Sequence, residues 1–256
     1  MNILFIGNSF SVDVSTYIHQ IAEANNLDIN VYVLYIGGCP IKKHYENYLN
    51  KVMPYEFFIN GSKEREKWCD LFEGLKYTHY DYISFQQVSQ DSGDPDTYFP
   101  DLPLLMEGVR KYSDATFLLH KTWSYAKTFR HWKYGENPLN QAQMDKDIAN
   151  AYEVVSEKVG IKYIMPSGLA VTKAREVFGD DLNRDGFHLN ERGRTLTGIL
   201  LTYYLSGAKE LDLSKFVPSG RTFDDVTPGI DVKELPILNK IAKETIQDNK
   251  GHNLYE

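Results

Sequence analysis

The sequence predicts an α/β protein built as a three-layer α/β/α sandwich with a central five-stranded parallel sheet. Short apolar runs alternate along the chain with longer segments in which apolar residues recur at helical spacing. The runs are continuously apolar, which is typical of parallel strands that are buried on both faces. Right-handed crossovers between such strands place helices on both sides of the sheet.

Strands and helices are expected in alternation from the N-terminus. Residues 2–6 are predicted to be a strand, residues 12–26 an amphipathic helix, and residues 29–35 a second strand closed by Gly37 and Gly38. Further strands are expected at 82–85, 115–119 and 161–164. The remaining helices of the core are expected at 102–112, 139–159, 169–177 and 189–205.

The 256 residues suit one domain with a core at about 2–206. Residues 40–78 hold aromatic and charged residues without a clear period, which predicts a helical or hairpin insertion near the rim of the sheet. The alternation is lost from residue 208 onward, so 208–256 is interpreted as a C-terminal extension with one last helix at 232–246.

Composition argues against several classes of function. The net charge of −7 and the lack of a basic run argue against a nucleic-acid partner. The chain has no apolar stretch long enough to span a membrane, and it lacks a signal-peptide pattern. The sequence therefore predicts a cytoplasmic protein, or a periplasmic or secreted one if a signal peptide has been removed.

Neither a metal nor a cofactor is expected. The histidines show no HExxH pattern, and Cys39 and Cys69 lie in no metal-ligand spacing. Two cysteines are too few for a disulfide framework, so two free thiols are expected. The sequence makes no prediction about the oligomeric state.

Ser9, Asp185 and His188 are the candidate catalytic residues. Ser9 follows the first strand, and Asp185 and His188 lie three residues apart just before the helix at 189–205. In acyl transfer a serine attacks, an imidazole takes its proton, and a carboxylate holds the imidazole in the required tautomer. The carboxyl ends of parallel strands meet at one edge of the sheet, so Ser9, Gly38 and Gln86 should share a rim.

Each motif also has a purely structural interpretation. Ser9 or Ser11 would serve equally well as the N-cap of the following helix. Asp185 could be a turn residue, with His188 a surface side chain. The order of the motifs and their common position at strand ends favour the catalytic interpretation.

Four short blocks resemble those of SGNH (GDSL-like) hydrolases. They are Gly7-Asn8-Ser9-Phe10, Gly37-Gly38, Gln86-Gln87-Val88-Ser89 and Asp185-Gly186-Phe187-His188. The resemblance implies a Ser-His-Asp esterase, of an uncharacterised branch similar to carbohydrate acetylesterases. It also implies an oxyanion hole made by the N–H groups of Ser9 and Gly38 and by the amide of Gln86. The third block lacks the family's asparagine, so Gln87 and Gln90 remain alternatives to Gln86.

The expected substrate is a short-chain acyl ester, most simply an acetyl group on a carbohydrate. Trp123 and Tyr125 follow the fourth strand and are candidates for stacking on a sugar, although burial in the core is the commoner role of such residues. His131, Trp132 and Tyr134 in the next loop have the same two interpretations. Two alternative functions remain: a catalytically inactive carbohydrate-binding protein, and a thioesterase or lipase that uses the same triad.

Overall fold

The computed structural model describes residues 1–130, 140–218 and 230–255. The strands are β1 (Asn2–Gly7), β2 (Asn30–Tyr35), β3 (Tyr55–Ile59), β4 (Ser62–Cys69), β5 (Tyr82–Phe85), β6 (Thr116–His120) and β7 (Ile164–Met165). The α-helices are α1 (Ser9–Ser15), α2 (Ile18–Ala24), α3 (Ile41–Asn50), α4 (Leu71–Leu75), α5 (Asp101–Arg110), α6 (Gln141–Val159), α7 (Ser167–Phe178), α8 (Glu191–Ser206) and α9 (Leu235–Asp248). Short 3₁₀ turns occur at η1 (Pro95–Tyr98) and η3 (Val232–Glu234).

The sheet is mixed and has seven strands in the order β4-β3-β2-β1-β5-β6-β7. Five neighbouring strands pair in parallel, in the order β2, β1, β5, β6 and β7. At one edge, β3 pairs antiparallel with β2 and with β4. The predicted α/β class is confirmed, but the prediction of a purely parallel five-stranded sheet is incomplete. The insertion at 40–78 supplies the two additional strands at one edge.

The added hairpin has a recognisable turn. Asn60 and Gly61 connect β3 to β4 with φ values of 52° and 79°. Two consecutive positive φ angles match the twist of a two-residue hairpin, for which Asn-Gly is the preferred pair. A Cβ atom at Gly61 would also lie 2.3 Å from the carbonyl oxygen of Thr16. The expectation for 40–78 is a helix or a hairpin, and the Asn-Gly pair is the sequence signal for this hairpin.

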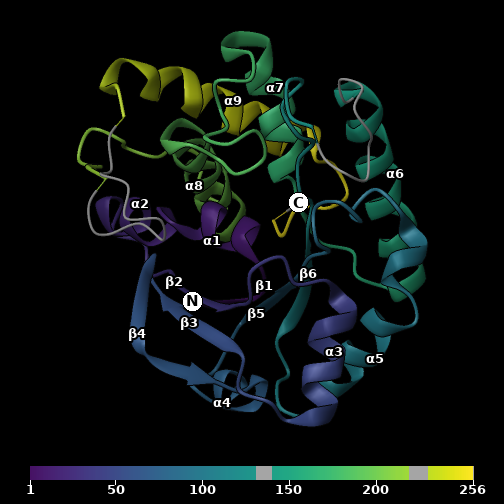
Figure 1. The fold of residues 1–256 in the computed structure, drawn as a ribbon. Helices are drawn as coiled ribbons and strands as arrows, with labels where there is room; N and C mark the ends of the chain where they lie inside the picture. The colour runs from purple at the N-terminus through teal and green to yellow at the C-terminus, as the bar shows by residue number, and fades with distance from the viewer. Residues whose placement is uncertain (131–139, 219–229, 256) are drawn as a thin grey trace.

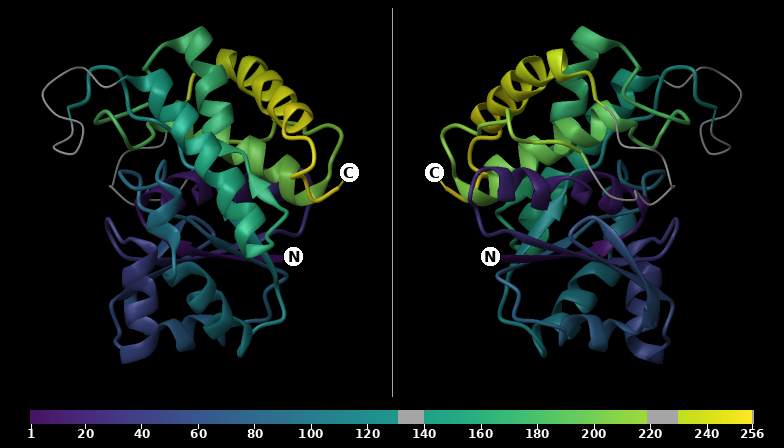
Figure 2. Two further views of the ribbon diagram at one scale, coloured as in Figure 1. Left: turned by 90° about the vertical axis from the view of Figure 1, so that its right-hand side faces the viewer. Right: turned by 90° about the vertical axis from the view of Figure 1, so that its left-hand side faces the viewer.

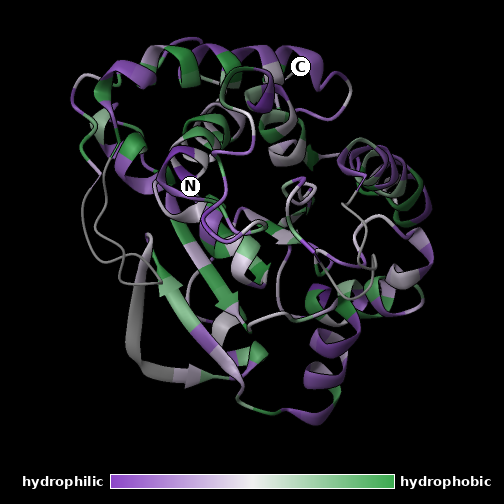
Figure 3. Ribbon diagram, turned by 45° about the horizontal axis from the view of Figure 1, so that its top comes forward, coloured by the Kyte–Doolittle hydropathy of each residue, from purple (hydrophilic) through white to green (hydrophobic). Residues whose placement is uncertain are grey.

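Helices cover both faces of the sheet. In Figure 1, α1, α2, α7, α8 and α9 lie above the sheet, while α3, α4 and α5 lie below it. The side views in Figure 2 show the same separation, with the purple and green helices on one side and the blue helices on the other. Figure 3 shows hydrophobic colours along the central strands and hydrophilic colours along outward faces of the helices.

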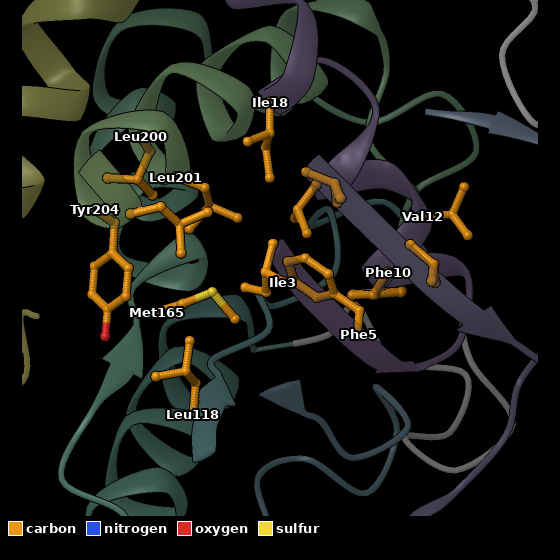
Figure 4. Close-up of a cluster of buried hydrophobic side chains, with 14 of the residues drawn as sticks. Ile3, Phe5, Phe10, Val12, Ile18, Leu118, Met165, Leu200, Leu201 and Tyr204 are labelled. Atoms are coloured by element: carbon orange, nitrogen blue, oxygen red, sulfur yellow. The ribbon is translucent and has the colours of Figure 1, made fainter. Parts of the chain in front are cut away.

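The core beneath the upper helices joins the central strands to α8. Figure 4 shows Ile3 and Phe5 of β1 beside Leu200 and Leu201 of α8. All four side chains are fully buried. Burying aliphatic and aromatic side chains of this size contributes about 1.5–3 kcal/mol each. This packing fixes the first strand, and with it the start of α1, against the helix that follows Asp185 and His188.

The predicted helix at 12–26 is in fact two helices, α1 and α2. The break follows Ser15, where the hydroxyls of Ser15 and Thr16 both donate to the carbonyl oxygen of Val12. Such side-chain hydrogen bonds compete with the helical ladder. The first helix also starts earlier than expected, at Ser9, because Asn8 rather than a serine caps it.

The C-terminal extension packs on the core through α9. This helix contacts α7 and α8, and Arg192 of α8 pairs with Glu234 at 2.7 Å. Beyond α9, the N–H of Ile164 in β7 donates to the carbonyl oxygen of His252 at 3.2 Å. The extension thus caps the edge of the sheet opposite the hairpin. In the described ranges, no helix is long and apolar enough to cross a membrane.

Candidate active site

Ser9 lies at the tight turn between β1 and α1. The Asn8 side chain caps α1 by accepting the N–H of Phe10 at 3.1 Å, which leaves Ser9 as the first helical residue. A Cβ atom at Gly7 would lie 2.1 Å from Ser11 Oγ, so a larger residue would displace the buried hydrogen bond from Ser11 to Gln86. The strand end and the cap together place the Ser9 side chain at the carboxyl edge of the sheet.

Asp185 and His188 lie on a closed turn between α7 and α8. The N–H of Arg184 donates to the carbonyl oxygen of His188 at 3.0 Å. Gly186 adopts a φ of +95°, a conformation that L residues rarely adopt. Oδ1 of Asp185 accepts the N–H groups of Phe187 and His188 at 3.2 and 2.8 Å. The carboxylate is therefore held by the backbone of its own turn.

The three predicted side chains form a continuous hydrogen-bonded chain. Ser9 Oγ lies 2.8 Å from His188 Nε2, and His188 Nδ1 lies 2.6 Å from Asp185 Oδ2. A carboxylate only accepts, so Nδ1 carries the proton and Nε2 is free to accept from the Ser9 hydroxyl. The His188 side chain is 17% exposed and that of Asp185 42%, so the site is open to solvent at its rim.

The surroundings of Asp185 keep it ionised. Partial burial raises its pKa, but hydrogen bonds from the His188 ring and from the backbone N–H groups of His188 and Phe187 outweigh burial. The net pKa of Asp185 lies below its ordinary value. A charged Asp185 is the form that orients an imidazole and stabilises its protonated state.

Two backbone N–H groups are available for an oxyanion. Ser9 is the first residue of α1, where helical N–H groups lack intrahelical partners. The N–H groups of Ser9 and Gly38 have no hydrogen-bond acceptor within the part of the chain that the structure describes. Gly38 has a φ of +60° and is exposed. Both groups are unengaged among the described residues, and their role as oxyanion donors stays a prediction.

The amide of Gln86 is not presented to Ser9. Gln86 is buried, and its Nε2 donates to Asn8 Oδ1 at 2.7 Å and to the carbonyl oxygen of Gln87 at 3.5 Å. The Gln87 side chain is buried too, and its Nε2 donates to Thr97. The expectation that Gln86 donates to the oxyanion is thus not supported, because its donors are already used. Gln90 is half-buried and also has partners of its own.

Gln86 instead belongs to a buried polar chain beneath Ser9. Its Oε1 accepts from Ser11 Oγ at 2.6 Å and lies 3.0 Å from His120 Nδ1. Since Oε1 only accepts, His120 Nδ1 carries the proton and Nε2 accepts from Ser167 Oγ at 3.1 Å. Burial lowers the pKa of His120 to about 3, so its ring is neutral. His120 was not predicted, although a histidine ending an apolar strand at the functional rim is a usable signal.

Trp123 and Tyr125 are not accessible to a sugar. Trp123 is fully buried, stacks on Phe10 with ring centroids 4.1 Å apart, and donates to the carbonyl oxygen of Phe187 at 2.7 Å. Tyr125 is 1% exposed, with its hydroxyl 2.9 Å from Ser89 Oγ. Both are therefore core residues. Trp123 packs on Phe10 and Tyr125 on Phe187, the two phenylalanines beside the His188 ring. His131, Trp132 and Tyr134 lie outside the described residues.

The remaining expectations concern metals and cysteines. In residues 1–130, 140–218 and 230–255, no group of three or more His, Cys, Asp or Glu side chains is arranged to hold a metal ion. Cys39 and Cys69 are both buried, and neither forms a disulfide. Burial raises the pKa of the Cys39 thiol to about 12, so it is not a reactive thiolate.

Other proteins resemble this chain in sequence or in fold. Residues 2–215 match a family described as a domain of unknown function, DUF4886. The chain belongs to the DUF4886 family. The crystal structure of a DUF4886 protein from Bacteroides uniformis is 30% identical, with a TM-score of 0.84 over 99% of this chain and 98% of that one. No protein of curated function matches the sequence.

More distant solved structures share the fold of this DUF4886 protein. An acetylxylan esterase from Geobacillus stearothermophilus is 14% identical, with a TM-score of 0.51 over 78% of this chain and 93% of that one. A GDSL-like lipase from Bacteroides thetaiotaomicron is 12% identical, with a TM-score of 0.50 over 80% and 88%. The resemblance to SGNH/GDSL-like hydrolases is therefore confirmed at the level of the fold.

Proposed function

We propose that this DUF4886 protein is a serine hydrolase that cleaves a short-chain acyl ester with Ser9, His188 and Asp185. The observation that supports the proposal is the chain of two short hydrogen bonds, 2.8 Å from Ser9 to His188 and 2.6 Å from His188 to Asp185. Nucleophile, base and orienting acid are within the reach that such catalysis needs.

Acylation begins with attack of Ser9 Oγ on the ester carbonyl carbon. His188 Nε2 takes the hydroxyl proton, and the carbonyl oxygen becomes an oxyanion that the N–H groups of Ser9 and Gly38 stabilise. When the tetrahedral intermediate collapses, the C–O bond to the alcohol breaks and His188 returns the proton to the leaving oxygen. Asp185 keeps the imidazole in place while it is charged.

Deacylation repeats the same steps with water. His188 takes a proton from water, which attacks the acyl carbon, and Ser9 leaves with the proton that His188 returns. Each turnover therefore consumes one ester and one water and releases an acid and an alcohol. The chain's own side chains supply every proton transfer in this scheme.

We infer that the acyl group is small, with acetyl the first candidate, and that the alcohol is polar, as in a carbohydrate. The rings of Phe187 and Phe10 pack beside the His188 imidazole, with centroids 4.0 and 6.0 Å away. Phe10 is buried, but Phe187 is half-buried and limits the space beside the base, which favours a compact acyl group. The shared fold with an acetylxylan esterase makes acetylated xylo-oligosaccharides a sensible early substrate.

The test is hydrolysis of p-nitrophenyl esters with two, four, eight and twelve acyl carbons, followed by release of acetate from acetylated xylo-oligosaccharides. Ser9→Ala should remove turnover, whereas the matched variant Ser15→Ala should keep it. Ser15 lies in the same helix and its hydroxyl only donates to Val12. Turnover by Ser9→Ala at the parental rate would refute the proposal. Binding of sugar without hydrolysis would favour the inactive carbohydrate-binding alternative, and a preference for the longest chain would favour a lipase.

A further inference from the structure

A buried carboxylate in α1 contacts both ends of the turn that carries Asp185 and His188. Asp13 lies four residues after Ser9 and is 1% exposed. Its Oδ2 accepts the N–H of Leu189, the residue after His188, at 2.8 Å. Its Oδ1 accepts from Nη1 of Arg184, the residue before Asp185, at 3.0 Å.

A second arginine completes the surroundings of this carboxylate. Arg194 of α8 donates to Asp13 Oδ1 through Nε at 3.0 Å and Nη2 at 2.9 Å, and through Nη1 to Glu191 at 3.0 Å. Arg194 is also 1% exposed. Two carboxylates thus face two guanidinium groups, so the four formal charges balance. The hydrogen bonds of this cluster hold α1, the turn and α8 in fixed relative positions. Because its charges balance, the cluster adds no net charge near His188.

These contacts connect the helix that carries Ser9 to the turn that carries Asp185 and His188. Ser9 and Asp13 are one turn apart on α1, while the two contacted residues flank Asp185 and His188 directly. Arg184 also donates to the carbonyl oxygen of Leu189, which closes the loop around the turn. Any movement of the turn relative to α1 must therefore disturb Asp13.

We propose that Asp13 is a positioning residue that sets the distance between Ser9 Oγ and His188 Nε2. This inference rests on the proposed hydrolase function. Asp13 touches neither the reacting atoms nor the triad side chains; it acts through the backbone and side chain on either side of the turn. Asparagine cannot replace it, because a carboxamide has one acceptor oxygen where Asp13 uses two.

The experiment measures kcat and KM for p-nitrophenyl acetate in the parent, in Asp13→Asn and in Asp145→Asn. Asp145 is the control: it is half-buried, accepts from Thr172 and pairs with Arg175, but none of its described contacts is with the turn. A misplaced base costs roughly a hundredfold in rate, so kcat of Asp13→Asn should fall by about that factor. KM should stay within about twofold, because this positioning role does not include substrate binding. Asp145→Asn should retain both constants.

Hydrogen exchange of the turn supplies a second readout that does not need activity. The amide of Leu189 should exchange about tenfold faster or more in Asp13→Asn than in the parent, since a charge-assisted hydrogen bond is lost. Asp145→Asn should leave this amide unchanged. If Asp13→Asn does not fold, Arg184→Gln removes one end of the contact at a partly exposed position and should change both readouts in the same direction.

The outcomes separate the two proposals. A folded Asp13→Asn protein with parental kcat and parental exchange would overturn the role of Asp13. A parent that hydrolyses no ester would refute the hydrolase function, and the exchange measurement would then decide alone whether Asp13 holds the turn. A fall in kcat with faster exchange in Asp13→Asn only is the predicted result.

Discussion

Asn8 Nδ2 donates to the carbonyl oxygen of Cys39 at 3.2 Å, which ties the turn that carries Ser9 to the turn that carries Gly38. Its Oδ1 accepts at the same time from the N–H of Phe10 and from Gln86. One buried carboxamide thus fixes the two loops that present the candidate oxyanion donors.

Replacing Asn8 should therefore affect rate as well as stability. Asn8→Ala removes a helix cap, which costs about 1 kcal/mol, and also removes the closer of the two acceptors of Gln86 Nε2. We expect kcat to fall by about tenfold, because the Ser9 and Gly38 donors lose their common support. Urea unfolding and ester hydrolysis measure the two effects.

A matched cap elsewhere provides the control. Asn140 caps α6 by accepting the N–H of Gln143 at 3.1 Å, and it makes no contact with either catalytic loop. Asn140→Ala should lower stability alone. An Asn8→Ala protein with the parental kcat would show that Asn8 is only a cap.

Asp185→Asn should lower kcat by about three to four orders of magnitude, because an amide no longer selects the His188 tautomer that accepts from Ser9. The pKa of Asp185 is depressed, so its contribution to stability is present above its unfolded-state value near 4 and is lost as the pH falls through the folded value. The parent should thus lose stability relative to Asp185→Asn only below about pH 4. Unfolding measured from pH 3 to 8 tests this, and an advantage of the parent that disappears already near neutral pH would contradict it.

Two buried histidines should make the fold sensitive to acid. Burial lowers the pKa of both His44 and His120 to about 3, well below the unfolded-state value near 6.5. The unfolded chain binds more protons between these values, so stability should fall by about 1.4 kcal/mol per pH unit for each histidine as the pH drops below about 6.

The His44→Phe variant separates the two contributions. His44 stacks on Tyr55 at an interplanar angle of 13°, so a phenyl ring keeps most of the packing. The variant loses one hydrogen bond, between Nδ1 and the Tyr55 hydroxyl at 2.9 Å, while Nε2 has no partner in the described structure. The slope of unfolding free energy against pH should be about half that of the parent. An unchanged slope would mean that His44 does not titrate as described.

Trp123→Phe should destabilise the protein without changing sugar recognition. The variant loses the hydrogen bond to the carbonyl oxygen of Phe187, which keeps Asn183 Nδ2 as its other donor, so the cost should be about 1 kcal/mol. KM should be unchanged for p-nitrophenyl acetate and for an acetylated xylo-oligosaccharide alike. A rise in KM for the oligosaccharide alone would indicate that Trp123 does stack on the sugar.

Sequence alone predicts the parts of the site that depend on strand ends. The positions of Ser9, Gly38, Asp185 and His188 follow from the order of motifs and from the common edge of parallel strands. The direction of a carboxamide does not, because it depends on which neighbours take its donors. Gln86 therefore shares the expected rim but points to Asn8 and not to Ser9.

The β3–β4 hairpin and the buried Asp13 also have recognisable signals in the sequence. Asn60-Gly61 is a hairpin turn, and it accounts for the two strands missing from the predicted sheet. Asp13 stands between Val12 and Val14 in a segment predicted to be an amphipathic helix. An aspartate that is buried in such a helix is nearly always paired with a basic side chain. Its partners, Arg184 and Arg194, lie far away in sequence, so only the fold brings them together.

The most direct test of the central claim is labelling with a fluorophosphonate, followed by mass spectrometry of the intact protein and of its peptides. An activated serine should gain one phosphonyl group at Ser9, and both Ser9→Ala and His188→Ala should remain unlabelled. The Ser15→Ala protein should label like the parent. A parent that stays unlabelled at Ser9, or that labels equally well without His188, would contradict the catalytic role of this Ser-His-Asp chain.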